Sequence, residues 1–137
     1  MTKVCHYCKL EKSLDNFHVQ KAGKYGKGTM CRDCKKIDGK IRKQSLTGKY
    51  QQYQSNAKTA HREFKLTLEQ FEEFWNKNCH YCGDKIVGVG IDRVNSSIGY
   101  ILENLVPCCF SCNRMKSDIE TDRFLEQCLK IVSNLEL

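Results

Sequence analysis

Eight of the ten cysteines in this sequence stand in four CxxC pairs, a spacing that suits metal binding. The two thiolates of one CxxC turn can reach the same tetrahedral zinc ion, and a second pair completes its four ligands. Joining the pairs that are nearest in sequence predicts two structural zinc ions per chain. The first would be held by Cys5, Cys8, Cys31 and Cys34, and the second by Cys79, Cys82, Cys109 and Cys112. Disulfide bonds and thiol redox chemistry stay open as alternatives.

Two cysteines lie outside this pattern. Cys108 would need three intervening residues to pair with Cys112, whereas Cys109 repeats the interval of the other pairs. Cys109 is therefore the predicted ligand. Cys128 falls in an apolar run, 124–132, and is expected to be a small buried side chain.

The charge of the chain is concentrated before the second predicted zinc site. The net charge is +4 over residues 1–34, +7 over 35–65 and −4 over 66–137. Lysine and arginine along a phosphate backbone release condensed counterions, so nucleic acid is the expected partner. The sequence has no apolar run long enough to span a membrane, and its first residues do not resemble a signal peptide. A cytoplasmic location is expected, in the host cell if a phage encodes the protein.

The basic segment that begins at residue 35 has few helix breakers. It predicts a helix through Tyr53, with Gly39 and Gly48 as weak points. The side chains expected to contact DNA are Lys35, Lys36, Lys40, Arg42 and Lys43. A merely solvated helix face is the alternative interpretation of these charges.

The second half of the chain predicts a strand, a loop, a strand and a helix. Thr67 and Gln70 match a capping box that opens a helix, and Phe71, Phe74 and Trp75 form its apolar face. A β-branched stretch over 85–94 predicts the first strand, and 105–108 the second. A helix is expected from Phe110 through Lys116. This ββα order lies between the two CxxC pairs of the second zinc site.

Residues 79–119 resemble the HNH endonucleases, also called the ββα-metal or His-Me finger family. The resemblance rests on the ordered combination CHYCG, GIDRV, GY, ENLVPC and CFSCNRMK. It implies a small α+β zinc-stapled fold, with a ββα-metal nuclease core flanked by two four-cysteine zinc sites and helices. Asp92 and Asn113 would hold one catalytic magnesium, or manganese, per chain, because such hard ions prefer oxygen ligands. Asn104 would tie the loop that supports the first strand.

One position departs from the family. Arg93 stands where the general-base histidine usually follows the metal-binding acid, and an arginine stays protonated and cannot accept a proton. The sequence is similar to zinc-stapled restriction enzymes of this family, homodimers in which a tyrosine replaces that base. By this resemblance Tyr100 activates the nucleophile and Arg93 contacts the scissile phosphate. His80, inside a zinc turn, is the competing base.

Two further cations on the predicted helix are candidates for DNA contacts. Lys116 lies three residues after Asn113, on the same helical face, and would meet a neighbouring phosphate or stay in solvent. Arg114 would contact DNA. The expected domains are an N-terminal zinc module (1–38), a basic helical linker that contacts DNA (39–66) and the nuclease domain with the second zinc site (67–137).

The favoured function is therefore a metal-dependent, sequence-specific, restriction-like DNA endonuclease that acts as a homodimer. Two alternatives are kept. A homing endonuclease of a phage or mobile element would use the same catalytic unit on a longer, asymmetric site. A zinc-stapled protein that binds DNA without cutting it would have lost its base.

Overall fold

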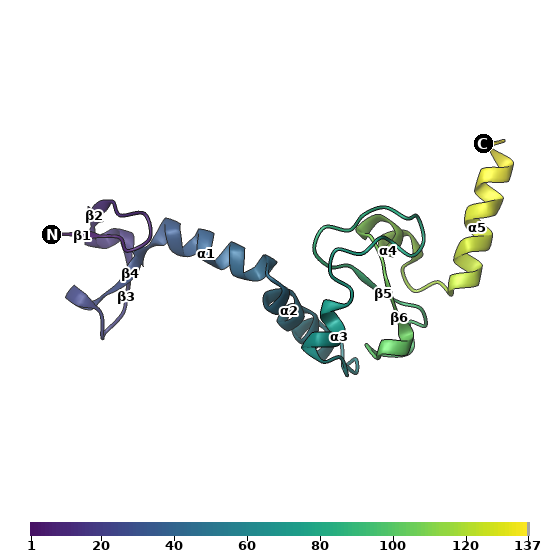
Figure 1. Cartoon of the computed structure of the whole chain (residues 1–137), viewed down its shortest axis with the longest axis horizontal. Coiled ribbons are helices and arrows are strands. Elements are labelled where there is room, and N and C mark those ends of the chain that lie inside the picture. The colour runs from purple at the N-terminus through teal and green to yellow at the C-terminus, as the bar shows by residue number, and fades with distance from the viewer. Residues whose placement is uncertain (137) are drawn as a thin grey trace. The chain divides into compact units, whose positions relative to one another are not determined.

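The computed structural model describes residues 1–136. It divides into two compact units, Met1–Gln44 (unit 1) and the chain from Ser45 onward (unit 2) (Figure 1). Residue 137, the last of the expected nuclease domain, lies outside the described residues. Among the described helices, none is long and apolar enough to cross a membrane.

Unit 1 consists of two short antiparallel hairpins followed by a helix. Its elements are β1 (Thr2–Val4), β2 (Glu11–Ser13), β3 (Phe17–Val19), β4 (Lys27–Cys31) and α1 (Arg32–Gln44), with 3-10 turns at Leu14–Asn16 and Lys24–Gly26. β1 pairs with β2, and β3 with β4. The buried cluster of this unit is Phe17 together with Cys5, Cys31 and Cys34. A core of this size seldom folds a domain without further support, and a metal ion on the clustered thiols could supply it.

Unit 2 carries the remaining elements. They are α2 (Leu46–Thr59), α3 (Leu68–Glu72), β5 (Ile91–Arg93), a 3-10 turn (Leu102–Asn104), β6 (Leu105–Pro107), α4 (Phe110–Lys116) and α5 (Thr121–Asn134). The long basic helix expected from residue 35 is interrupted at Ser45, not at a glycine. The hydroxyl of Ser45 accepts a hydrogen bond from the amide of Gly48 at 3.1 Å and caps α2. A serine N-cap thus ends one helix and starts the next.

Aromatic side chains build the core of unit 2. Leu66, Phe71, Phe74, Ile91 and Leu105 form the buried cluster. Tyr50 and Tyr53 of α2 meet the ring of Phe71 edge to face, at 5.4 and 5.3 Å between centroids. The predicted capping box between Thr67 and Gln70 is confirmed, and both of its hydrogen bonds are present. Phe71 and Phe74 are buried as expected, whereas Trp75 is only partly buried.

The ββα unit is present, but its first strand is shorter than predicted. β5 pairs antiparallel with β6, with Asp92 opposite Val106, and α4 follows. The expected strand over 85–94 shrinks to Ile91–Arg93 because two glycines break the extended backbone. Gly88 has a φ of +80°, and a Cβ on Gly90 would lie 2.1 Å from the carbonyl oxygen of Cys108. The predicted fold class, a small α+β fold with a ββα unit and two four-cysteine clusters, is confirmed.

Candidate functional site

The structure gathers each predicted set of four cysteines into one cluster. The four sulfurs of each set lie within 4.8 Å of one another, and the sulfurs of Cys82 and Cys109 are 3.7 Å apart. A tetrahedral ion with zinc–sulfur bonds of about 2.3 Å separates its sulfurs by roughly 3.8 Å. Both clusters could therefore bind zinc. Cys108 belongs to neither cluster and is buried beside Cys109, and Cys128 is partly buried on α5.

The two clusters share one backbone design. In each, the residue after the first CxxC pair has a positive φ, +60° at Lys9 and +80° at Gly83, and its amide donates to the carbonyl of the first cysteine. Burial alone would raise the pKa of Cys5 and of Cys79, but backbone hydrogen bonds outweigh it and place both pKa values at about 6. Burial raises the pKa of the Cys108 thiol to about 12. The turns thus favour the thiolate, the form that binds zinc, at Cys5 and Cys79, whereas burial raises the pKa of Cys34 to about 12 and also raises that of Cys112.

One cavity in unit 2 contains the residues that the sequence marked as catalytic. It has a volume of about 190 Å³ and is lined by Arg62, Ile91, Asp92, Arg93, Ser96, Tyr100, Asn113, Ser117 and Asp118. Asp92 and Arg93 come from β5, Tyr100 from the loop before β6, and Asn113 from α4. None of the described residues that line it is a histidine, so His80 has no place in it. The strand, the loop and the helix of the ββα unit therefore converge here.

Asp92 is buried against a lysine. The Nζ atom of Lys116 lies 3.1 Å from Oδ2 of Asp92 and 3.3 Å from Oδ1, and Tyr81 donates its hydroxyl hydrogen to Oδ2 at 2.7 Å. Lys116 also donates to the carbonyl of Arg93 at 3.2 Å and is completely buried. The expectation that Lys116 faces a phosphate or solvent is therefore wrong. Its ammonium neutralises Asp92 and fastens α4 to β5.

Two asparagines occupy structural positions around the cavity. The side-chain amide nitrogen of Asn113 donates to the backbone carbonyl of Ile91 at 3.1 Å. The side-chain carbonyl oxygen of Asn113 therefore stays without a hydrogen bond among the described residues. Asn104 is buried, donates to the carbonyls of Asn95 and Gly99, and accepts from the amide of Asn95 at 2.9 Å. Asn104 therefore ties together the ends of the loop that leads to Tyr100.

Tyr100 lies among aromatic rings and below a guanidinium. Its ring centroid is 5.6 Å from Phe64, 5.9 Å from Tyr53 and 5.6 Å from the Cζ of Arg93. The Tyr100 hydroxyl makes no hydrogen bond with any residue in the described part of the chain. Burial, followed by the charge of Tyr100, raises the pKa of Tyr53 to about 12. Tyr53 therefore stays protonated at neutral pH, while the hydroxyl of Tyr100 is available to a substrate.

Sequence reasoning missed four residues of this cavity that carry functional groups: Arg62, Ser96, Ser117 and Asp118. No sequence motif predicts that these residues belong to the site, because they follow a helix end or lie in loops with no periodic pattern. Arg62 enters from the segment after α2, 30 residues before the first predicted catalytic residue. Only the folded arrangement of the loops brings it to the site.

The side chains expected to contact DNA are all exposed. Lys35, Lys36, Lys40, Arg42 and Lys43 lie on α1 of unit 1. Arg42 forms an ion pair with Asp38 at 2.9 Å, and the carboxylate of Asp38 partly compensates the positive charge of Arg42. Arg114 lies on α4 of unit 2, with its Cζ 6.0 Å from the ring centroid of Phe110. Within α1, Lys36, Lys40 and Lys43 follow the i, i+4, i+7 spacing of one helical face.

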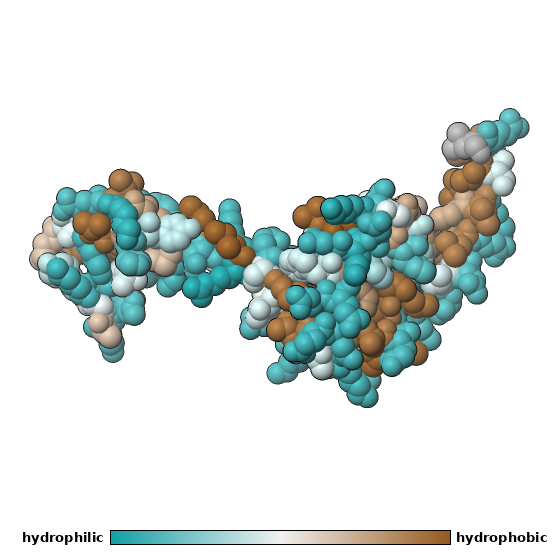
Figure 2. Space-filling model, viewed as in Figure 1, coloured by the Kyte–Doolittle hydropathy of each residue, from teal (hydrophilic) through white to brown (hydrophobic). Residues whose placement is uncertain are grey.

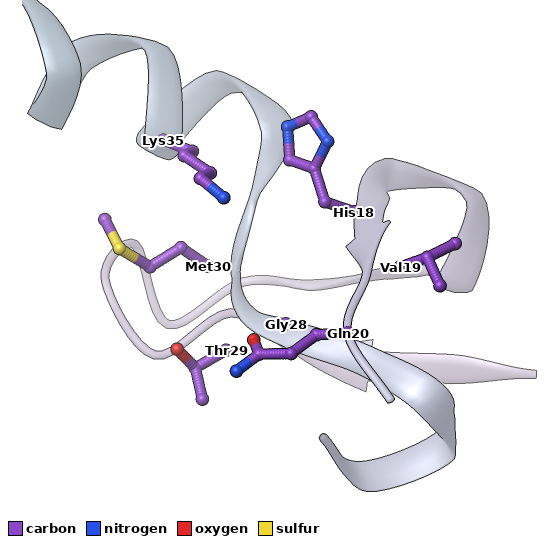
Figure 3. Close-up of a pocket in the computed structure, with 7 residues that line it drawn as sticks. All are labelled: His18, Val19, Gln20, Gly28, Thr29, Met30 and Lys35. Atoms are coloured by element: carbon purple, nitrogen blue, oxygen red, sulfur yellow. The ribbon is translucent and has the colours of Figure 1, made fainter. Parts of the chain in front are cut away.

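A second hollow lies in unit 1, away from the thiols. It has a volume of about 170 Å³, and Figure 3 shows the side chains that line it, among them His18, Gln20, Thr29 and Lys35. Desolvation and then the charges of Arg32, Lys35 and Lys36 lower the pKa of His18. The neutral form of this histidine is therefore favoured beside a local excess of positive charge.

Comparisons with known proteins give two relatives. No family model matches the chain. The "Uncharacterized protein R423" of Acanthamoeba polyphaga mimivirus is 40% identical over 87 residues, which is 62% of this chain and only 16% of that protein. The solved structure of the rare-cutting HNH restriction endonuclease PacI is similar with a TM-score of 0.49 and 25% identity, over 90% of this chain and 88% of that one. PacI is also the enzyme whose motif the sequence of residues 79–119 resembles.

Proposed function

We propose that this chain is a metal-dependent DNA endonuclease of the HNH type, which hydrolyses phosphodiester bonds in double-stranded DNA. The observation that carries the proposal is the single cavity in which Asp92, Arg93, Tyr100 and Asn113 meet on a ββα unit. The carboxylate and the amide oxygen can hold a metal ion that assists attack on a phosphodiester, and the phenol and the guanidinium can act on the nucleophile and the phosphate.

The donor set around the cavity fits one hard divalent cation. Oδ2 of Asp92 accepts a hydrogen bond from Tyr81 and lies 3.1 Å from the ammonium of Lys116, whereas Oδ1 accepts only a longer hydrogen bond from Lys116, at 3.3 Å. The carbonyl oxygen of Asn113 is left over because its amide nitrogen is held by Ile91. These two oxygens would hold magnesium or manganese, with water and phosphate completing the shell. When bound, such an ion stabilises negative charge on the phosphate and on the leaving 3′ oxygen.

Tyr100 is the group we assign to activation of the nucleophile. Its hydroxyl is not engaged by other described residues, and it lines the same cavity as Asp92 and Asn113. The phenolate would either accept a proton from the attacking water, or attack phosphorus itself, expel the 3′ oxygen and form a phosphotyrosine ester that water then hydrolyses. The guanidinium of Arg93 lies over the ring, with its Cζ 5.6 Å from the ring centroid, and places a positive charge beside it.

The two four-cysteine clusters are proposed to hold structural zinc, one ion each. Four sulfur ligands leave no open position for substrate, which distinguishes such sites from catalytic zinc. In unit 1 the zinc would position α1, whose first turn contains Cys34 and whose exposed lysines are proposed to contact the DNA backbone.

A homodimer is proposed because one ββα site cuts one strand at a time. The helix α5 and the residue that follows it offer a surface for a second copy. Leu125, Leu129, Ile131, Val132 and Leu135 are all more than 40% exposed, and Figure 2 shows hydrophobic residues along this helix. Five exposed apolar side chains on so short a segment form the kind of patch that marks an interface.

The decisive experiment is cleavage of supercoiled plasmid and genomic DNA by protein dialysed free of magnesium, with and without added magnesium. Dialysis is preferable to a chelator, because a chelator would also remove structural zinc, and zinc content is measured alongside. Magnesium-dependent linearisation supports the proposal. DNA binding without any cleavage at full zinc content would instead establish the non-catalytic alternative.

Sequencing the ends of the genomic fragments separates the two kinds of endonuclease. A short palindrome at every end supports the restriction-like role that we favour. Long, asymmetric sites with tolerated mismatches would assign the chain to the homing enzymes instead.

A further inference from the structure

Arg62 is brought to the cavity by a backbone bridge that no sequence motif announces. The amide of Tyr100 donates to the carbonyl of Glu63 at 2.8 Å, and the amide of Lys65 donates to the carbonyl of Tyr100 at 2.9 Å. These bonds surround a parallel bridge between Phe64 and Tyr100. The segment that carries Arg62 is therefore fastened directly to the residue proposed to activate the nucleophile.

A glycine permits this close approach. A Cβ on Gly99 would lie 2.4 Å from the carbonyl oxygen of Glu63, closer than real side chains allow. Any larger residue at this position would push the two segments apart. At the other end, the amide of Arg62 donates to the carbonyl of Ala57 at 2.8 Å, and Ala57 is buried in α2. Both sides of Arg62 are thus fixed to the frame of unit 2.

The two arginines of the cavity differ in how their side chains are used. Nη1 of Arg93 donates to the carbonyls of Ser96 and Ile98, at 2.6 and 2.9 Å, and the Cζ of Arg93 lies over the Tyr100 ring. Arg93 therefore braces the loop. Arg62 lines the same cavity, and its side chain forms no hydrogen bond or ion pair with the other described residues. A guanidinium offers five N–H donors.

From these contacts we infer that Arg62 binds the non-bridging oxygens of the scissile phosphate. This inference rests on the proposed function. It makes Arg62, in place of Arg93, the main contact to the phosphate. A phosphodiester entering the cavity meets the carboxylate of Asp118, and Lys116 is already paired with Asp92. The guanidinium of Arg62, on a fixed backbone and not engaged by other described residues, adds positive charge to that of the proposed metal ion. Its fork of donors fits two phosphate oxygens at once.

The test compares Arg62→Ala with Arg62→Lys and with the control Arg123→Ala. Arg123 is an exposed arginine of the same unit that does not line this cavity. With magnesium and saturating DNA, Arg62→Ala should lower the single-turnover cleavage rate by about a hundredfold or more, the usual effect of losing one transition-state donor. Arg62→Lys should recover part of that loss, because it restores the charge without the fork. Arg123→Ala should cut at the wild-type rate.

A binding measurement without magnesium separates this inference from the proposed function. The slope of log K against log salt should fall by about 0.9 in Arg62→Ala, which corresponds to one neutralised phosphate. If the wild type does not cleave, the nuclease proposal fails, and the slope still shows whether Arg62 contacts a phosphate. Unchanged rate and slope in Arg62→Ala would overturn the inference. A lower slope with an unchanged rate would overturn the assignment to the scissile phosphate.

Discussion

The Nζ atom of Lys116 lies 3.1 Å from Oδ2 of Asp92, and both side chains are withdrawn from solvent. This pair connects the last turn of α4 to the middle of β5, so it holds together two of the three elements that form the proposed active site. Tyr81 and the carbonyl of Arg93 satisfy further hydrogen bonds of the pair. A buried ion pair with complete hydrogen bonding costs little to keep, but breaking it leaves a buried charge without a partner.

The first prediction is that Lys116→Met destabilises the protein by about 3 to 5 kcal/mol, the usual cost of an unpaired buried charge. The double variant Asp92→Asn with Lys116→Met should lose less stability than Lys116→Met alone, because no charge is then left unpaired. Denaturant unfolding of zinc-loaded protein measures both. The matched control is Lys130→Met, which breaks an exposed pair with Glu126 and should cost less than about 1 kcal/mol. Equal losses at both lysines would contradict a stabilising role for the buried pair.

The second prediction concerns zinc. Purified protein should contain two zinc ions per chain, and Cys109→Ala should lose one of them while keeping the other. Cys108→Ala is the matched control, because Cys108 is the adjacent cysteine, is buried, and lies outside both clusters. It should keep both ions. Elemental analysis of the two variants decides the ligand, and loss of zinc from Cys108→Ala alone would reverse the assignment.

The two four-cysteine clusters and the ββα order could be predicted from the sequence because each depends on local spacing. A CxxC pair forms its own turn, and the strand and helix signals lie within a few residues. The burial of Lys116 could not be predicted, because spacing places it on the face of Asn113 but does not say that this face packs on β5. Arg62 was missed for a related reason. Its position depends on the bridge between Phe64 and Tyr100, a pairing of two irregular segments without any periodic pattern.

The third prediction concerns the basic face of α1. Changing Lys36, Lys40 and Lys43 together to alanine should weaken DNA binding and lower the salt slope by about 0.9 for each phosphate that is no longer neutralised. All three are exposed on one helical face. The control triple Lys77, Lys85 and Lys130 to alanine removes the same charge from exposed positions of unit 2. Fluorescence anisotropy over a series of salt concentrations measures both. Equal slopes for the two triples would show that net charge, and not this face, determines binding.

The last prediction is that Tyr100→Phe removes cleavage but leaves zinc content and DNA binding intact. Removal of a general base lowers the rate by about 10² to 10⁴, and removal of a nucleophile lowers it at least as far. Only the deprotonated phenol can act in either role, and a rise in pH favours deprotonation of any phenol. The wild-type rate should therefore climb as the pH rises from neutral, and the climb should vanish in Tyr100→Phe.

Tyr53→Phe is the control that makes this result specific to Tyr100. The two rings are in contact, but burial raises the pKa of Tyr53 to about 12, so Tyr53 stays protonated throughout the same pH range. Tyr53→Phe should keep the rising pH profile. A DNA–protein adduct on a denaturing gel, seen in the wild type and absent from Tyr100→Phe, would identify direct attack, whereas its absence favours a base. If Tyr100→Phe cuts at close to the wild-type rate while His80→Ala is inactive, the tyrosine assignment is wrong, and His80 must reach the substrate from outside the cavity.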